Sequence, residues 1–457
     1  MSAIRIDGCE VIVTMDDAGR EIAGGSLLIR DGVIAWVGAG EPPADAEADA
    51  EVEVIDASGM VALPGLVNAH HHLYQSMTRV RAQEQGLFGW LQELYPVWAG
   101  LSVEWMRASA RAGLAELALS GCSTTTDHHY IFPRGAAGIF EAEVEAAREL
   151  GLRFHPCRGS MDLGQSRGGL PPDGVVEEID DILSQTADLI RRLHDPAPGS
   201  MLRIAVAPCS PFSVSRRLME ESRVLARRLG VRLHTHIAET LDEERFCLET
   251  FHRRPVELLE DLDWLGPDVW LAHCVHVSAA DIDRLARTGT AVAWCPTSNL
   301  RLGSGLAPAR DLLEAGVPVG LAVDGSASND SGHLLAEVRQ AMLVARGRSG
   351  PSAMSARQAL RVATRGSAAC LGREDIGALE PGKRADVALF DLANLAYAGA
   401  EADPVAALVF CQSQRVTHLL VEGRWVVRDG ELVTADEGAI GREVRRLATQ
   451  ILSGGRR

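Results

Sequence analysis

Short apolar runs alternate with helix-like segments through the middle of this 457-residue chain. Helix-like stretches such as Trp105–Leu119 and Arg216–Leu229 fill the intervals between runs that suit buried strands. Eight such runs occur, at residues 61–67, 123–126, 152–155, 202–207, 231–234, 269–272, 290–294 and 317–323. Eight strands that are each followed by a helix over roughly 300 residues are typical of the α/β class, as a TIM-type (β/α)₈ barrel. An open, doubly wound sheet would alternate similarly, but no G-x-G-x-x-G motif follows an early strand to favour it.

Both ends of the chain show a different pattern, in which strand-like segments are separated by Asp-Asp, Gly-Gly, Asp-Gly and Glu-Gly turns. These segments lie at residues 4–14, 26–30, 33–37, 51–55, 386–390, 418–421 and 425–427. Two β-rich ends around a different middle predict one discontinuous domain. We therefore expect a small β-sandwich built from residues 1–60 and 375–457, and a catalytic barrel built from residues 61–374.

The composition excludes several classes of protein. Hydrophobic residues make up 46% of the chain, which is typical of a globular protein and not of a disordered one. The formal net charge of −17 argues against a nucleic-acid polymer as partner, because phosphate backbones are bound through clustered Lys and Arg. None of the nine cysteines forms a C-x-x-C pair, so neither a disulfide scaffold nor a cysteine zinc site is expected.

The amino-terminal residues are acidic where a signal peptide would be apolar, and no uncharged apolar run reaches the length of about 18 residues that a membrane span needs. We therefore expect a cytoplasmic protein that does not contact a membrane. We also expect a homo-oligomer.

Residues that can bind metals or move protons stand at the ends of the predicted strands, where the catalytic groups of such barrels gather. They follow the first, fifth, sixth and eighth strands: His70, His72, His236, Glu239, His273 and Asp324. Side chains alternate along a strand with a period of two, so His70 and His72 point to the same side. Three imidazoles and one carboxylate that leave space for a water form a suitable site for Zn²⁺ or Fe²⁺.

The chain resembles the amidohydrolase superfamily in five motifs spread over nearly its whole length. They are PGLVNAHHH at 64–72, HIAE at 236–239, LAH at 271–273, VDG at 323–325 and PGKRAD at 381–386. This resemblance implies a metal-bearing barrel together with a small β-sandwich made from both termini, which agrees with the pattern above.

Within that superfamily the motifs look like those of the mononuclear deaminase branch. The resemblance then implies that His70, His72, His236 and Asp324 hold one divalent metal, zinc or alternatively iron. It implies that Glu239 shuttles protons, that His273 orients water and substrate, and that Asp324 also takes a proton from the attacking water. The binuclear branch uses a carbamylated lysine or a glutamate on the fourth strand. Here that strand ends in Ala-Pro-Cys-Ser at 207–210, and Lys383 is the only lysine in the chain.

Further motifs, at 70–75, 88–98, 127–130, 158–161 and 207–214, look most like those of 8-oxoguanine deaminases. The implied reaction is hydrolysis of 8-oxoguanine, a small heterocycle, to urate and ammonia. Triazine hydrolases, which remove chloride or an alkylamine from a triazine ring, are an alternative, because they share Trp90-Leu91 and the GSASND segment at 325–330. Another purine or pterin deaminase and an inactive binding homologue also remain as alternatives.

The candidate substrate-binding residues are Gln75, Trp90, His129 and Cys209. Gln75 offers an amide to the edge of a flat heterocycle, although it could equally support the site from behind. Trp90 could stack on the ring or pack as part of a lid. His129, like its neighbour His128, could line the pocket or support it. Cys209 stands where guanine deaminases carry an arginine, and this difference argues against guanine itself as the substrate.

Overall fold

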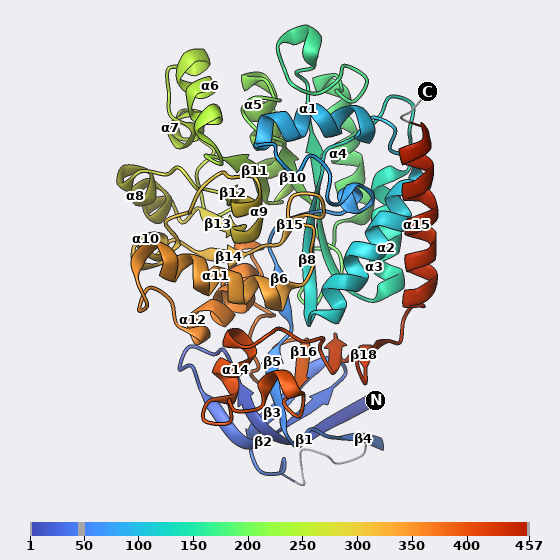
Figure 1. Cartoon of the computed structure of the whole chain (residues 1–457), viewed down its shortest axis with the longest axis vertical. Helices are drawn as coiled ribbons and strands as arrows, with labels where there is room; N and C mark the ends of the chain where they lie inside the picture. Colours follow the sequence, from blue (N-terminus) through green and yellow to red (C-terminus); the bar gives the residue numbers. More distant parts are fainter. Residues whose placement is uncertain (1, 44–50, 455–457) are drawn as a thin grey trace.

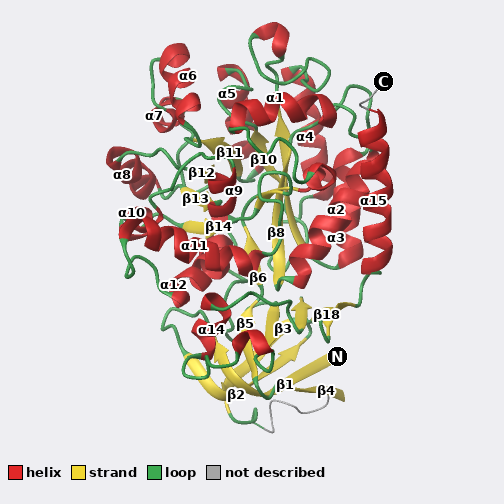
Figure 2. Cartoon of the chain, viewed as in Figure 1, coloured by secondary structure: helices red, strands yellow, loops and turns green. Residues whose placement is uncertain are grey.

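The computed structural model describes residues 2–43 and 51–454. Its central sheet has eight parallel strands that follow one another around a barrel in chain order, as Figures 1 and 2 show. The strands are β6 (Leu66–Asn68), β8 (Cys122–His129), β9 (Arg153–Ser160), β10 (Ala205–Pro208), β11 (Leu233–Ile237), β12 (Val269–His273), β13 (Ala291–Trp294) and β14 (Val319–Leu321). The two end strands meet where the Ala69 N–H donates to the Leu321 carbonyl at 3.0 Å. The predicted (β/α)₈ barrel is therefore confirmed.

Helices surround the barrel and connect its strands (Figure 2). They are α1 (Leu87–Trp98), α2 (Val103–Leu119), α3 (Ile139–Leu150), α4 (Ile179–Leu193), α5 (Arg216–Leu229), α6 (Leu241–Phe251), α7 (Pro255–Asp261), α8 (Ala279–Thr288), α9 (Pro296–Arg301), α10 (Ala309–Glu314), α11 (Leu334–Ser349), α12 (Ala356–Arg361) and α13 (Ser367–Cys370). Helix α5 illustrates why they form: Leu218, Ser222 and Leu225 are buried at helical spacing, while its arginines and glutamates face outward. The Ser215 hydroxyl accepts the Leu218 N–H at its start, and Gly230 ends it with a φ of +67°.

Two short strands and one short helix continue the barrel at its carboxyl end. Strand β7 (His71–His72) pairs in parallel with β15 (Asp324–Gly325), so the segments that follow the first and last barrel strands lie side by side. The 3₁₀ helix η2 (Leu73–Thr78) follows β7 directly. This arrangement brings residues about 250 positions apart in sequence to the same edge of the barrel.

The two ends of the chain form a second sheet, in the strand order β19-β18-β17-β16-β5-β1-β2-β3 with β4 beside β1. The strands are β1 (Ser2–Val13), β2 (Glu21–Arg30), β3 (Val33–Ala39), β4 (Glu51–Asp56), β5 (Met60–Pro64), β16 (Val387–Asp391), β17 (His418–Val421), β18 (Arg424–Arg428) and β19 (Glu431–Leu432). The sheet bends back on itself, because Ile34 at its outer edge exchanges backbone hydrogen bonds with residues 382 and 383, just before β16. The bent sheet encloses its own core, which includes Ile6, Leu27 and Leu389.

The apolar run at 61–67, expected as one strand, is divided between the two sheets. Strand β5 pairs with β1 and β16 in the terminal sheet, and β6 begins the barrel. Gly65 lies at the crossing, where a Cβ atom would stand 2.5 Å from the Ser123 Cβ. A glycine is therefore required for the chain to pass this close to β8.

The terminal sheet docks at the amino ends of the barrel strands, the end opposite the paired strands β7 and β15 (Figure 1). The buried Arg153, at the start of β9, forms ion pairs with Asp386 at 3.0 Å and with Glu422 at 2.7 Å. After η5 (Leu395–Tyr397) and α14 (Pro404–Phe410), the last helix α15 (Glu437–Gly454) runs along α2 on the outside of the barrel. Within residues 2–43 and 51–454, no helix is both long enough and apolar enough to span a membrane.

Candidate metal centre and active site

A cavity lies at the carboxyl ends of the barrel strands. Helix α1 lies over this end of the barrel (Figure 1) and contributes Trp90, Leu91 and Tyr95 to the cavity wall. The barrel itself contributes the groups with catalytic potential: His72, His236, Glu239, His273 and Asp324. Five of the six residues expected from the strand ends thus line one cavity, and the sixth, His70, lies next to His72 and His236.

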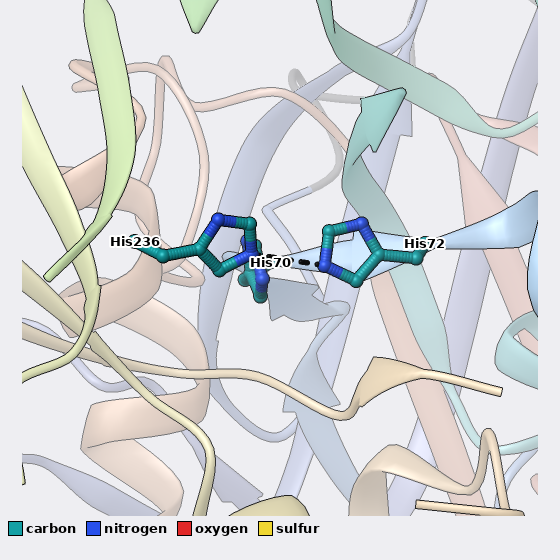
Figure 3. A group of neighbouring side chains, drawn as sticks. All are labelled: His70, His72 and His236. Atoms are coloured by element: carbon teal, nitrogen blue, oxygen red, sulfur yellow. Dashed lines mark hydrogen bonds between the residues drawn. The ribbon is translucent and has the colours of Figure 1, made fainter. Parts of the chain in front are cut away.

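The imidazole rings of His70, His72 and His236 lie next to one another, as Figure 3 shows, and the last two line the cavity. The Nε2 atoms of His72 and His236 are 3.1 Å apart. The Oδ1 atom of Asp324 lies 3.2 Å from the Nε2 of His70 and 3.3 Å from the Nε2 of His72. Four atoms that can donate an electron pair therefore face one small volume.

The opposite nitrogen of each ring is held by a hydrogen-bond acceptor. The Nδ1 of His72 donates to the His128 carbonyl at 2.8 Å, and the Nδ1 of His236 donates to the Cys209 carbonyl at 2.7 Å. Because the hydrogen is on Nδ1, the lone pair of each ring is on Nε2 and points to the centre. Burial, followed by the neighbouring imidazoles, holds the pKa of His236 well below its usual range, so this ring is neutral.

Hydrogen bonds also fix the orientation of the Asp324 carboxyl group. Its Oδ2 accepts hydrogen bonds from the Ser298 hydroxyl at 2.5 Å and the Ser328 hydroxyl at 3.0 Å, which leaves Oδ1 for the centre. Burial would raise the pKa of Asp324, but the imidazoles of His70, His273 and His72 around its carboxyl group hold that pKa well below its usual range. The carboxylate is therefore ionised.

The donor set fits a divalent cation. Among the described residues, neither the His70 Nε2 nor the Asp324 Oδ1 has a hydrogen-bond partner, although both atoms are buried. Buried polar atoms without partners are costly, and a group of electron-pair donors facing one another needs a positive charge between them. Three imidazole nitrogens and one carboxylate oxygen are ligands that suit Zn²⁺ or Fe²⁺. His70, His72, His236 and Asp324 would hold that ion.

Glu239 and His273 lie together beside these donors. Their Oε2 and Nε2 atoms are 3.5 Å apart. Burial, together with the charges of Asp324 and Glu243, raises the pKa of Glu239 well above its usual range, so its carboxyl group carries a proton. The Asn299 amide donates to the Nδ1 of His273 at 3.1 Å, which leaves the hydrogen of this ring on Nε2, facing Glu239. The two residues thus present two protons to the cavity.

Glu243, which sequence reasoning did not identify, fixes the backbone of this acid. Its buried carboxylate accepts the N–H groups of Ala238 at 2.7 Å and Glu239 at 2.9 Å. Ala238 adopts a φ of +52°, a conformation that costs free energy outside glycine and that these hydrogen bonds stabilise. One signal in the sequence could have pointed to Glu243. The T-x-x-E pattern from Thr240 to Glu243 is common at the start of a helix, where the glutamate can accept backbone N–H groups.

His234 is a second residue that sequence reasoning missed. Its Nε2 accepts a hydrogen bond from the Nδ1 of His70 at 2.7 Å, and its own Nδ1 donates to the Trp270 carbonyl at 2.8 Å. His234 therefore sets the tautomer of a metal donor, as the carbonyl groups do for His72 and His236. The signal was present in the sequence, because His234 and His236 form an H-x-H pair like that of His70 and His72.

We expect His234→Phe to weaken metal binding by about 10- to 100-fold, because it removes the acceptor that orients His70. A phenyl ring retains the stacking on Trp270, where the ring centroids are 4.3 Å apart. Competition for zinc between the protein and a chelator measures the change, with His234→Gln as the control that keeps an acceptor. An unchanged zinc affinity in a folded Phe variant would contradict this role.

Three of the four expected substrate-binding residues line the cavity: Gln75, Trp90 and Cys209. The Gln75 Oε1 accepts the Ala327 N–H at 3.3 Å, and the Trp90 indole donates to the Ala327 carbonyl at 3.2 Å, so one backbone position anchors both side chains. Burial raises the pKa of the Cys209 thiol to about 12, so it remains neutral.

His129 lies elsewhere. His128 is the residue of this pair that faces the barrel interior, with its ring stacked 4.7 Å from that of His236. The alternation along β8 turns His129 to the opposite side, where its Nε2 donates to the Ile131 carbonyl at 2.9 Å. The cavity wall instead includes Tyr95, Tyr130 and Phe212, which sequence reasoning did not single out as contacts.

The chain is similar to known proteins over nearly its whole length. A model of the Amidohydrolase family matches residues 61–426. The chain is 47% identical over 439 residues to the 8-oxoguanine deaminase of Pseudomonas aeruginosa, a match that covers 95% of this chain and 96% of that protein. It is 37% identical over 470 residues to the hydroxydechloroatrazine ethylaminohydrolase of a Pseudomonas species, covering 99% and 97% of the two chains.

Among solved structures, the zinc complex of atrazine chlorohydrolase from Arthrobacter aurescens superposes on this fold with a TM-score of 0.92. The sequence identity is 37%, and the match covers 97% of this chain and 100% of the other. The chain belongs to the amidohydrolase family. Its barrel, its donor set and these relatives together make it a metal-dependent aminohydrolase.

Proposed function

We propose that this enzyme deaminates 8-oxoguanine by hydrolysis, giving urate and ammonia, with zinc at the four donors. The observation that carries the proposed chemistry is the position of Glu239 and His273 beside the four proposed metal ligands. The Glu239 Oε2 lies 3.5 Å from the His273 Nε2, and burial raises the pKa of Glu239 well above its usual range. The relative that is 47% identical and named 8-oxoguanine deaminase supports the choice of substrate, and the zinc complex of the structural neighbour supports the choice of metal.

The protons move between groups that are already in place. A divalent cation held by His70, His72, His236 and Asp324 would supply a water molecule whose pKa is lowered toward about 7. The ionised Asp324 would take a proton from the water that attacks the carbon bearing the amino group. Glu239 donates its proton to the adjacent ring nitrogen, which makes that carbon electrophilic. The His273 Nε2–H would donate to the developing negative charge. The proton taken up by Asp324 would pass to the amino nitrogen, which leaves as ammonia, and the new hydroxyl group would return a proton to Glu239 as it becomes a carbonyl.

Cys209 is the residue from which we infer selectivity between purines. An arginine at this position would present a planar fork of donors to a purine carbonyl, whereas a neutral thiol is only a weak donor. Losing a charged hydrogen bond costs about 1.5–3 kcal/mol, which corresponds to a factor of roughly 10 to 100 in rate.

We therefore expect kcat/KM for 8-oxoguanine to exceed that for guanine by at least about 10-fold, because the cavity lacks the charged donor that guanine would use. Ammonia release from both purines under one set of conditions measures this ratio. Equal values, or a preference for guanine, would show that Cys209 does not discriminate in this way.

Triazine hydrolysis is the second candidate, favoured by the relative and the structural neighbour that act on triazines. The same attacking water and the same proton donors would displace an alkylamine or chloride instead of ammonia. A panel of 8-oxoguanine, guanine, isoxanthopterin, cytosine and a chlorotriazine separates the candidates when ammonia, ethylamine and chloride are all measured. We expect the highest kcat/KM for 8-oxoguanine, and a higher value for the triazine would overturn the proposed substrate.

A further inference from the structure

A second polar cluster lies outside the cavity, between β8 and α3. It consists of Asp127 and His129 on β8 and Glu143 on α3, and potential ligand or proton-binding atoms of the three residues lie within 4.8 Å of one another. All three side chains are 0% exposed. Asp127 and His129 alternate with His128, so they point away from the barrel interior while His128 points into it.

The cluster contains more buried hydrogen-bond acceptors than hydrogen atoms to satisfy them. The Asp127 Oδ1 accepts the Leu73 N–H at 2.6 Å, and His129 donates its Nε2 hydrogen to Ile131, so its Nδ1 has only a lone pair. In the described parts of the chain, the Asp127 Oδ2, both Glu143 oxygens and the His129 Nδ1 have no hydrogen-bond partner. Acceptors that face one another without water need at least one proton between them.

A shared proton agrees with the electrostatics of the pair. Burial raises the pKa of Asp127 to about 7. Burial and the charge of Asp127 raise the pKa of Glu143 well above its usual range. Two carboxylates this close and this deeply buried do not both ionise at neutral pH.

Two hydrogen bonds made by β8 connect the cluster to the metal centre. The His128 carbonyl orients the ring of His72, and the Asp127 carboxyl group holds the backbone N–H of Leu73, the next residue. The same segment continues into η2, which carries Gln75 to the cavity wall. Glu143, on a helix outside the barrel, is thus linked through Asp127 to the segment that carries His72, a proposed metal ligand.

We propose that Asp127 and Glu143 are positioning residues, whose shared proton fixes Asp127 as the acceptor of the Leu73 N–H and so holds His72 and Gln75 at the metal centre. The kinetic consequence rests on the proposed function, but the effect on metal retention does not. This role differs from simple packing, because it requires a hydrogen at one position between the two carboxyl groups.

Two substitutions of Glu143 distinguish a need for a hydrogen-bond donor at this position from a need for side-chain volume alone. Glu143→Gln supplies an N–H to Asp127 in place of the shared proton, whereas Glu143→Leu fills a similar volume without a donor. We expect the Gln variant to retain zinc against a chelator, and to keep kcat, within about twofold of the wild type. We expect the Leu variant to lose zinc about 10-fold faster and to lose about 10-fold in kcat, since one charge-assisted hydrogen bond is removed.

Glu145→Leu, an exposed change on the same helix, is the matched control and should leave both quantities unchanged. Equal zinc retention in folded Leu and Gln variants would overturn the proposal. If the Leu variant does not fold, Asp127→Asn tests it instead, because Asn keeps an acceptor for Leu73 and gives Glu143 a donor. Fast zinc loss from folded Asp127→Asn or Glu143→Gln would overturn the proposal, as would a second metal ion per wild-type chain that disappears in Glu143→Gln.

Discussion

Replacing Glu239 with Gln is expected to lower kcat by about 100-fold or more while the metal content is unchanged. The amide has nearly the same size as the carboxyl group but cannot transfer the proton that burial and nearby carboxylates keep on Glu239. It also leaves His70, His72, His236 and Asp324 in place as donors. Steady-state ammonia release and elemental analysis of the same preparation measure the two quantities together.

Glu249→Gln is the matched control for this substitution, because it makes the same chemical change at an exposed position of α6. We expect the control to retain wild-type kcat. A Glu239→Gln enzyme that stays near full activity would contradict the assignment of Glu239 as the proton donor, and a loss of metal in that variant would make Glu239 a ligand instead.

Removal of the metal is expected to abolish activity, with a fall in kcat of at least about 1,000-fold, because several kcal/mol of charge stabilisation are lost with the ion. The four donors converge within one small volume, so one equivalent of zinc per chain should restore the rate. Dialysis against a chelator, followed by titration with zinc and with Fe²⁺, measures the stoichiometry. Two tightly bound metals per chain, or full activity with none, would contradict a single centre.

That His70, His72, His236 and Asp324 lie close together could be predicted from the sequence because two general rules apply to them. The choice of these four as the metal ligands came from the resemblance to deaminases. Catalytic groups of this barrel gather at the carboxyl ends of strands, and period-two alternation places His70 and His72 on one side. His236 and Asp324 follow from the same rules. His72 and His236 are 164 positions apart in sequence, and His236 and Asp324 are 88 apart. The order of parallel strands around the barrel brings them together.

The orientation of His129 could not be predicted, because β8 is buried along its whole length. A strand that is covered on both faces shows no alternation of apolar and polar residues, so the sequence does not indicate which face points inward. Only the three-dimensional structure shows that His128 points inward, because its ring lies beside that of His236. For the same reason, the hydrogen bond between His70 and His234 is visible only after the strands are placed.

The boundary between the two sheets was also hidden in the sequence. Residues 61–67 form an unbroken apolar run, and both the terminal sheet and the barrel accept such a strand. Gly65 divides the run because the chain there passes Ser123 too closely for any side chain. A tertiary contact, and not a local preference, therefore sets this boundary.

The most direct test of the proposed function is the product balance of the zinc-loaded enzyme with 8-oxoguanine as substrate. We expect one ammonia and one urate for each molecule consumed, and only a small fraction of that rate with Glu239→Gln. An enzyme with a full complement of metal that releases no ammonia from 8-oxoguanine, yet releases chloride or ethylamine from a triazine, would contradict the proposed reaction.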